Sequence, residues 1–178
     1  QMGLSYSVVT SVDRDDLVDG GAGAFAMTIK QIKKFNPDCK VEVLIPDFNG
    51  NKSSLETVIK ASPDVLNHNI ETCRRVFRVV RPKGDYDQSI ELLRRVKELN
   101  PNIPTKSGMM VGLGETEDEI IETMNDLRKV NCDLLTIGQY LRPSKKHHEI
   151  DKFYHPKEFT KFEPVSYTHL TLPTMLPV

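Results

Sequence analysis

The sequence predicts an α/β protein whose strands form a parallel sheet. Short apolar segments rich in β-branched residues alternate with longer segments in which apolar residues recur at helical spacing. No tight-turn signal of the hairpin type joins one predicted strand to the next. Such alternation requires right-handed crossovers, so the expected architecture is either an open doubly wound sheet or a section of a barrel.

The predicted strands are short and each ends at a polar string. The first, Leu4–Thr10, is rich in β-branched and aromatic residues and runs into a loop of acidic residues and glycines. The other predicted strands are Val41–Ile45, Val65–His68, Thr105–Val111 and Leu134–Ile137.

Proline and capping residues bound the predicted helices. Apolar residues between Ala22 and Ile32 recur at steps of three and four, and Asn36-Pro37 ends this helix. Each later helix begins with a side chain that can cap backbone N–H groups and has a Glu or Gln three residues further on. These pairs are Ser53 with Glu56, Asp85 with Gln88, and Thr116 with Glu119.

Composition bounds the class of protein. The chain has 178 residues, which suits one domain or part of a larger barrel, and 24 Lys and Arg against 25 Asp and Glu give a net charge of −1. This balance provides no general attraction to nucleic acid or to an anionic membrane, so a small molecule or a protein is the expected partner. No apolar stretch approaches the roughly 18 residues of a membrane span, and Gln1–Tyr6 lacks signal-peptide character. We therefore expect a cytoplasmic protein.

The cysteines Cys39, Cys73 and Cys132 are scattered singly along the chain. An odd number without a close pair does not indicate a disulfide framework or a zinc site. We expect three isolated thiols that are buried or half-buried.

Four polar strings follow predicted strands: TSVDRDDL from Thr10, HNIET from His68, MVGLGET from Met110 and GQYLRPS from Gly138. The carboxyl ends of parallel strands meet at one edge, so these segments are expected to line one pocket. Acidic loops often only cap the following helix, and paired glycines often only form turns, so each string alone is a weak signal.

The side chains of these strings suit a polar organic ligand. Carboxylates after the first strand could bind an amine, and His68, Asn69 and Glu71 together could hold the vicinal hydroxyls of a ribose. Gly112 and Gly114 allow the backbone to approach a flat or phosphate-bearing ligand.

A basic run follows the last string. It is either a solvated surface or a dock for an acidic partner. Its predicted partner-binding residues are Arg142, Lys145, Lys146, His147 and His148. No third ligand near His147 and His148 is visible, so a metal site is not expected there.

In combination and in this order, the strings resemble lipoyl synthases of the radical S-adenosylmethionine (SAM) superfamily. The resemblance also includes DGGA from Asp19, PDFNG from Pro46, VRP from Val80, PTKSG from Pro104 and LTIGQYLRPS with its double histidine. It covers about Leu4 to Phe162 and implies a partial parallel (β/α) barrel, of which about five strands are present.

The resemblance implies an activity with its cofactors and partners. Lipoyl synthases use SAM and two 4Fe–4S clusters to insert two sulfur atoms into octanoyl chains carried by lipoyl carrier proteins. Such carriers are the glycine cleavage H protein and the lipoyl domains of 2-oxoacid dehydrogenases, and electron donor and iron–sulfur carrier proteins are further implied partners.

The resemblance also implies which residues bind the cofactor. Thr10, Ser11 and Asp13 match the region that holds the methionyl amino group, Asn69 and Glu71 match the ribose region, and Arg81 is placed to pair with the carboxylate. The residues that match the adenine side are Gly112, Gly114, Glu115, Gln139 and Tyr140.

The chain departs from the family pattern at both ends. The two three-cysteine runs and the Arg-Ser-Ser-Tyr string that hold the clusters in the family are absent, and Arg142 replaces a glutamine that is common in relatives. The string VSYTHLTLPT from Val165 resembles a translated sequencing-library adapter. We expect residues 1–163 to be a radical SAM fragment, catalytically inactive alone and without metal ligands, and residues 164–178 to be a non-native tail.

Other functions are also compatible with the sequence. One is a different radical SAM barrel enzyme, and another is a cofactor-free α/β module that docks an acidic carrier domain. A phosphate-binding barrel is a further alternative, but GQYLRPS lacks the glycine-rich turn that it requires.

Overall fold

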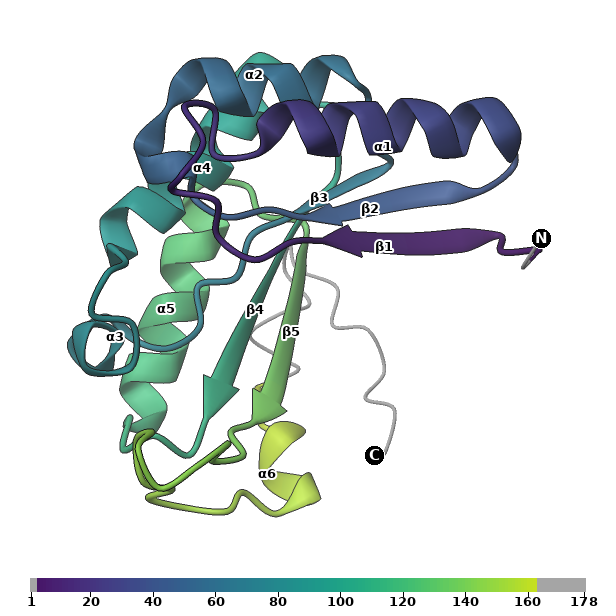
Figure 1. Ribbon diagram of the computed structural model, residues 1–178. Coiled ribbons are helices and arrows are strands. Elements are labelled where there is room, and N and C mark those ends of the chain that lie inside the picture. The colour runs from purple at the N-terminus through teal and green to yellow at the C-terminus, as the bar shows by residue number, and fades with distance from the viewer. Residues whose placement is uncertain (1–2, 163–178) are drawn as a thin grey trace.

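The computed structural model describes residues 3–162. The predicted non-native tail, residues 164–178, lies outside the described residues. Strands and helices alternate along the chain (Figure 1). The strands are β1 (Tyr6–Thr10), β2 (Lys40–Leu44), β3 (Val65–Asn67), β4 (Thr105–Val111) and β5 (Leu134–Gln139). The helices are α1 (Ala22–Phe35), α2 (Lys52–Lys60), α3 (Arg74–Val80), α4 (Tyr86–Leu99), α5 (Glu117–Lys129) and α6 (Pro156–Phe159), with a 3₁₀ turn, η1 (Phe48–Gly50).

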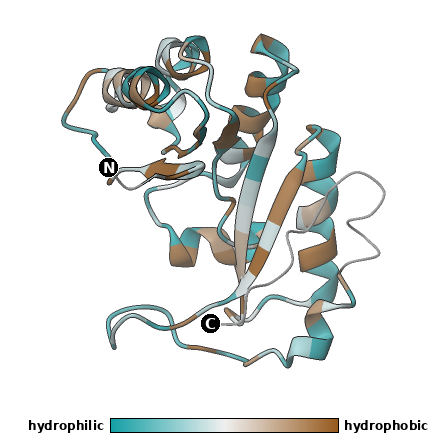
Figure 2. Ribbon diagram, turned by 90° about the vertical axis from the view of Figure 1, so that its right-hand side faces the viewer, coloured by the Kyte–Doolittle hydropathy of each residue, from teal (hydrophilic) through white to brown (hydrophobic). Residues whose placement is uncertain are grey.

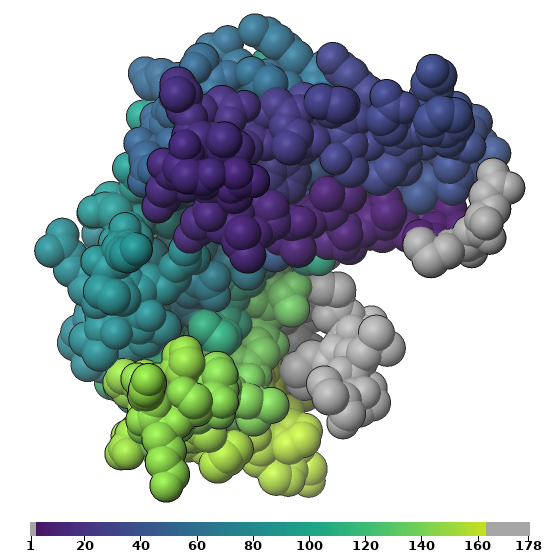
Figure 3. Space-filling model, in the orientation of Figure 1, coloured from purple at the N-terminus to yellow at the C-terminus, as the bar shows by residue number. Residues whose placement is uncertain are grey.

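The strand order decides between the two predicted architectures. All pairs are parallel, and the order β1-β2-β3-β4-β5 follows the sequence. A doubly wound sheet reverses its order at a switch point, whereas a barrel does not. The helices α1, α2, α4 and α5 lie on one side of the sheet (Figure 1). The fold is therefore a section of a (β/α) barrel that curves around an open inner face (Figure 3).

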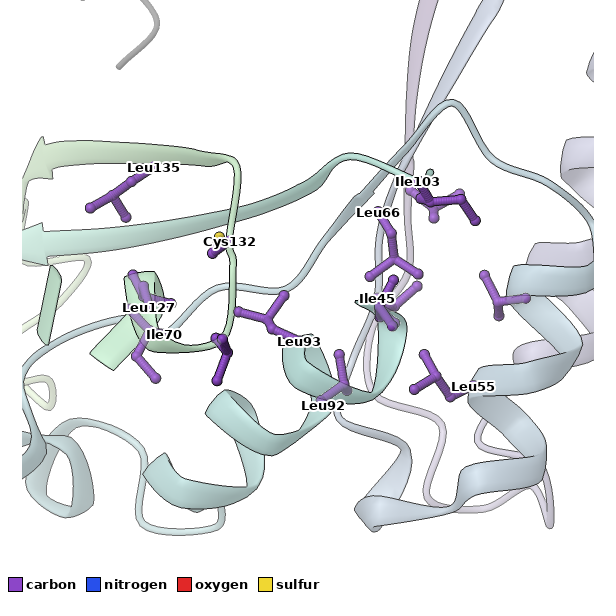
Figure 4. Close-up of a cluster of buried hydrophobic side chains, with 14 of the residues drawn as sticks. Ile45, Leu55, Leu66, Ile70, Leu92, Leu93, Ile103, Leu127, Cys132 and Leu135 are labelled. Carbon is purple, nitrogen blue, oxygen red and sulfur yellow. The ribbon is translucent and has the colours of Figure 1, made fainter. Parts of the chain in front are cut away.

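The hydrophobic core lies between the sheet and these helices. Residues of the strands that point outward, such as Val41, Val43 and Leu135, are fully buried against Ile29, Leu93 and other helix residues. Figure 4 shows Leu66, Leu93, Leu127 and Leu135 in this layer. On the inner face, by contrast, Tyr6 and Val8 of β1 are 46 % and 57 % exposed. Figure 2 shows that hydrophobic and hydrophilic residues alternate along the helices, as in amphipathic helices.

Two of the three predicted helix starts are confirmed. Asp85 accepts a hydrogen bond from the Gln88 N–H, and Thr116 and Glu119 form a complete capping box. The prediction for α2 was wrong: Asn51, not Ser53, is its cap, and the Asn51 side chain accepts from the backbone N–H groups of Ser53 and Ser54. Asparagine is as good a cap as serine, so the helix begins earlier in the sequence.

Helix α3 was not predicted. Its sequence RRVFRVV is rich in β-branched residues, and its cap position, Cys73, makes no side-chain capping bond. Burial of Phe77, which packs edge-on against Tyr86 with ring centroids 5.9 Å apart, stabilises the helix instead. Packing has overridden local propensity here.

The cysteines are confirmed as isolated thiols. Cys39, Cys73 and Cys132 are free and buried. Burial raises the pKa of the Cys132 thiol to about 12, which makes it unreactive at neutral pH. Among the described residues, no helix is both long and apolar enough to cross a membrane.

Glu119 links α5 to α3 and should make the free energy of unfolding decrease as the pH falls. Its carboxylate accepts from Arg75 Nε at 2.6 Å and Nη2 at 2.9 Å and also caps its own helix. The Arg75 hydrogen bond, with the backbone bond of Thr116, lowers the pKa of Glu119 to about 2. A carboxyl with a lowered folded pKa stabilises the fold above its unfolded pKa, and this contribution is lost as pH falls.

We therefore expect Glu119→Gln to flatten the dependence of stability on pH between about pH 5 and pH 2. The measurement is the urea unfolding midpoint at a series of pH values. Glu122→Gln, at an exposed position of the same helix, is the control. Parallel pH curves for wild type and Glu119→Gln would show that this carboxylate does not couple folding to acid.

Candidate functional site

A pocket opens where β1, β2 and β3 end. Its volume is about 140 Å³. The loops after these strands and the end of α3 supply most of its polar lining, and the last residue of β2 with the two residues that follow it supplies an apolar wall. The lining residues are Thr10, Ser11, Asp13, Leu44, Ile45, Pro46, His68, Asn69, Glu71 and Arg81. The pocket thus brings together all predicted site residues from the first half of the chain.

Glu71 is held in the pocket by backbone pairing with β4. Its N–H donates to the Gly108 carbonyl at 3.0 Å, and its own carbonyl accepts from the Met110 N–H at 2.7 Å. This pairing fixes Glu71 at φ 65°, a left-handed conformation that is uncommon for a residue other than glycine. Backbone strain of this kind concentrates at functional sites.

Burial raises the pKa of Glu71, and Arg81 opposes that shift. Arg81 Nη1 lies 3.2 Å from the Glu71 carboxylate, and Arg81 Nη2 lies 3.9 Å from that of Asp13. The guanidinium therefore joins the loops after β1 and β3. With 36 % of its side chain exposed, it still faces the opening of the pocket.

His68 does not offer its ring to a ligand, contrary to the ribose role suggested by the sequence. The ring is buried, with Nδ1 2.9 Å from the Ile45 carbonyl and Nε2 3.1 Å from the Ser89 hydroxyl. Burial lowers the pKa of His68, so the ring is neutral at pH 7. In that form Nδ1–H donates to the Ile45 carbonyl, and Nε2 faces the Ser89 hydroxyl, which itself donates to the Asp85 carbonyl at 3.0 Å. His68 therefore fixes the end of β3 against β2 and α4.

The predicted residues of the second half form a separate cluster at the ends of β4 and β5. The carboxylate of Glu115 accepts from the N–H groups of Gly112 at 2.7 Å and Leu113 at 2.8 Å, and Glu115 is 8 % exposed. Gly112 has φ 100° and Gly114 has φ 93°. In this structure Glu115 therefore stabilises the turn between β4 and α5.

Gln139 and Tyr140 hold the segment that follows β5, residues 141–155, which we call the strap. The Gln139 amide donates to the Lys152 carbonyl at 3.1 Å and accepts from the Tyr154 N–H at 2.9 Å. The Tyr140 hydroxyl donates to the His148 carbonyl at 3.0 Å. Neither residue, nor Gly112, Gly114 or Glu115, lines the pocket described above.

The basic residues lie on the strap. Lys145, Lys146 and His147 are exposed, whereas Arg142 folds back and donates to the carbonyls of Lys145 and His147. Arg142 also pairs with Glu149 at 3.2 Å. The basic surface is therefore part of the strap, and Arg142 stabilises the conformation of this segment.

Sequence reasoning missed the contribution of β4 to the pocket. Gly108 does not belong to any of the four polar strings, but its carbonyl binds Glu71 and its missing side chain leaves room for Asn69. The signal available in the sequence was a glycine inside a predicted strand, which often marks close backbone approach.

The pocket chemistry fits SAM. This cofactor carries an ammonium group, a carboxylate and a ribose diol, and the pocket offers Asp13, Arg81 and the pair Asn69 and Glu71 as complementary groups. The described residues do not provide ligands for an iron–sulfur cluster in the same way. Within residues 3–162, no group of three or more His, Cys, Asp or Glu side chains is placed to hold a metal ion.

A parallel barrel section with a polar pocket at its carboxyl edge defines a class of cofactor-binding barrels. The model of the radical SAM superfamily matches residues 1–127, and the chain belongs to this superfamily. SAM and a 4Fe–4S cluster are the cofactors of that superfamily.

Within this superfamily, the chain is similar in sequence to lipoyl synthases. The chain is 57 % identical over 167 residues to a lipoyl synthase of Caldanaerobacter subterraneus subsp. tengcongensis, covering 94 % of this chain and 58 % of that protein. It is 58 % identical over 159 residues to a lipoyl synthase of Symbiobacterium thermophilum, covering 89 % of this chain and 50 % of that protein. The chain thus spans about half the length of the curated relatives it matches.

Solved structures agree in fold. Methylornithine synthase (PylB) superposes with a TM-score of 0.72 at 13 % identity, covering 97 % of this chain and 50 % of that one. Streptococcus suis SuiB bound to S-adenosylmethionine gives 0.67 at 12 % identity, covering 94 % of this chain and 39 % of that one. These likenesses show a shared barrel architecture, which confirms the predicted fold class.

Proposed function

We propose that this chain is the SAM-binding part of a lipoyl synthase. The observation that carries the proposal is the convergence of Asp13, Asn69, Glu71 and Arg81 on one pocket, in a chain 57 % identical to a lipoyl synthase. Asp13 binds the methionyl ammonium, Arg81 binds the carboxylate, and Asn69 with Glu71 holds the ribose hydroxyls. Thr10 and Ser11 complete the methionyl end.

The complete enzyme inserts two sulfur atoms into the octanoyl chain of a lipoyl carrier protein. In that enzyme SAM is the source of a radical, and two 4Fe–4S clusters take part. The described residues of this chain contribute binding, orientation and exclusion of water, as proteins do for other cofactors. The carriers are the glycine cleavage H protein or the lipoyl domains of 2-oxoacid dehydrogenases.

The adenine end of SAM lies toward the second cluster of predicted residues. Gly112, Gly114, Glu115, Gln139 and Tyr140 follow β4 and β5, which are adjacent to β3 in the sheet. Their present hydrogen bonds stabilise the turn and the strap, so their contribution to adenine binding comes mainly from backbone placement.

The strap is the proposed contact for the carrier protein. Lys145 and Lys146 extend from it into solvent beside the carboxyl edge of the sheet, where an acyl-lysine must enter. Clustered positive charge increases the rate of encounter with an acidic domain. A cofactor-free docking module, the main alternative, predicts carrier binding that does not respond to SAM.

Replacement of Glu71 is the direct test of the cofactor pocket. We expect Glu71→Ala to weaken SAM binding by about 10- to 100-fold, because hydrogen bonds to a charged group contribute about 1.5–3 kcal/mol. Isothermal titration calorimetry with SAM and the purified chain measures the change. Glu71→Gln, which keeps the shape and loses the charge, should give an intermediate loss.

Glu122→Ala, an exposed carboxylate on α5, serves as the control and should bind as the wild type does. Thermal unfolding of each variant separates loss of fold from loss of binding. Equal SAM affinity in wild type and folded Glu71→Ala would remove Glu71 from the site, and no SAM binding by the wild type would favour the cofactor-free module.

A further inference from the structure

Gly108 lies in the middle of β4, directly behind the pocket. Its carbonyl accepts the N–H of Glu71 at 3.0 Å. Two residues further along, the Met110 N–H donates to the Glu71 carbonyl at 2.7 Å. The backbone of β4 on either side of Met109 therefore holds Glu71 in its left-handed conformation.

The space beside Gly108 is filled by Asn69. A Cβ atom at position 108 would lie 2.7 Å from Asn69 Oδ1, closer than Cβ atoms of folded proteins approach, and 3.2 Å from its Cγ, which is a tight contact. Gly108 is not among the glycines with positive φ, so its backbone would accept alanine. The absence of a side chain, and not the backbone conformation, is what this position provides.

Asn69 in turn supports Glu71. The Asn69 side chain opposes the rise in the pKa of Glu71 that burial causes, and both side chains line the pocket. Of the two Asn69 amide atoms, Oδ1 lies nearer to the position of a Cβ at residue 108, at 2.7 Å, and Nδ2 lies 3.7 Å away.

We propose that Gly108 is a positioning residue of the pocket, which seats Asn69 through its missing side chain and Glu71 through its carbonyl. The functional part of this inference rests on the proposed SAM site. The structural part does not, because it concerns only where the Asn69 amide lies.

The neighbouring strand offers a matched control. Gly138 of β5 pairs with Met110, and Gly108 pairs with Thr136, so both glycines lie on the same face of adjacent strands. A Cβ atom at Gly138 meets nothing within 4 Å. Gly108→Ala and Gly138→Ala thus make the same chemical change, with and without a neighbour to displace.

The first experiment follows the Asn69 side chain itself. In ¹⁵N-labelled protein, Gly108→Ala should shift the Asn69 side-chain amide resonances, assigned by their loss in Asn69→Ala, while Gly138→Ala should leave them in place. Because only the end of a flexible side chain is displaced, both variants should keep the wild-type fold. Unshifted Asn69 amide signals in Gly108→Ala, or equal shifts in both variants, would overturn the proposal.

The second experiment measures the consequence for the cofactor. Loss of one hydrogen bond changes affinity by about 3- to 10-fold, so Gly108→Ala should weaken SAM binding by that factor and Gly138→Ala should not. In an Asn69→Ala background, Gly108→Ala should have no additional effect, because its effect acts through Asn69. Additive losses would contradict that route.

The two experiments separate this inference from the proposed function. If the wild type fails to bind SAM, the proposed function of the pocket fails, while the Asn69 resonances still decide the role of Gly108. If SAM binds and the Asn69 resonances do not move, only the role of Gly108 fails.

Discussion

Lys106→Met is expected to lower the free energy of unfolding by about 3 kcal/mol, because removal of one partner leaves a buried charge without its counterion. The remaining charge is Glu42 of β2, which is 3 % exposed. Its carboxylate accepts from Lys106 Nζ at 3.0 Å, the Tyr6 hydroxyl at 2.6 Å and Asn67 Nδ2 at 3.1 Å. Neighbouring strands thus contribute to one ionic group on the inner face.

The direction of the Glu42 pKa supports this expectation. Burial alone would raise the pKa of Glu42, but the bonds from Tyr6, Lys106 and Asn67 hold it below the usual value. The folded state therefore contains a carboxylate at neutral pH, and loss of Lys106 removes the cation that compensates its burial.

Urea unfolding followed by circular dichroism measures the effect. Lys40→Met is the control, because Lys40 pairs with Asp64 at 3.2 Å while 66 % of its side chain is exposed, and such surface pairs contribute about 0–1 kcal/mol. The double variant Glu42→Gln/Lys106→Met should recover part of the loss. A cost for Lys106→Met no larger than that for Lys40→Met would mean that water screens the inner pair.

Gly112→Ala is the second large expected effect, with a cost of about 2 kcal/mol beyond that of Gly114→Ala. Both glycines have positive φ, so alanine is strained at either position. Only at Gly112 would the new Cβ atom overlap other groups, namely the Lys152 carbonyl and the Gln139 amide. At Gly114 the nearest atoms, in Asp151, are 3.9 Å away. The difference between the variants is therefore the cost of displacing the strap.

Chemical denaturation gives the difference in stability, and limited trypsin digestion reports on the strap. Faster cleavage at Lys145 or Lys146 in Gly112→Ala than in Gly114→Ala is the expected result, because trypsin cleaves opened segments. Equal stability and equal cleavage in the two variants would mean that Lys152 moves aside at no cost.

Local chemistry in the sequence predicted most of the fold. Asp85 and Thr116 cap their helices as expected because the interactions of a cap lie within four residues of it. Helix α3 was missed because its stability depends on the packing of Phe77 against Tyr86 of the next helix, which its own seven residues do not reveal. The choice between an open sheet and a barrel likewise depended on strand order, which no local pattern encodes.

The site was predictable to the extent that strand ends must converge. Asp13, Asn69 and Glu71 meet in one pocket because β1 and β3, which precede them, flank β2, and Arg81 joins them from the end of α3. The neutral, buried state of His68 and the space behind Asn69 were not predictable, since both depend on Ser89 and Gly108 in distant segments. Those contacts are visible only in three dimensions.

The amide of Gln139 has both of its functional atoms engaged by the strap, the nitrogen by Lys152 and the oxygen by Tyr154. A molecule that draws this amide toward itself must first release the backbone of those two residues. Ligand binding to the Gln139 amide and release of the strap are then linked equilibria. Each must shift the other by the same free energy.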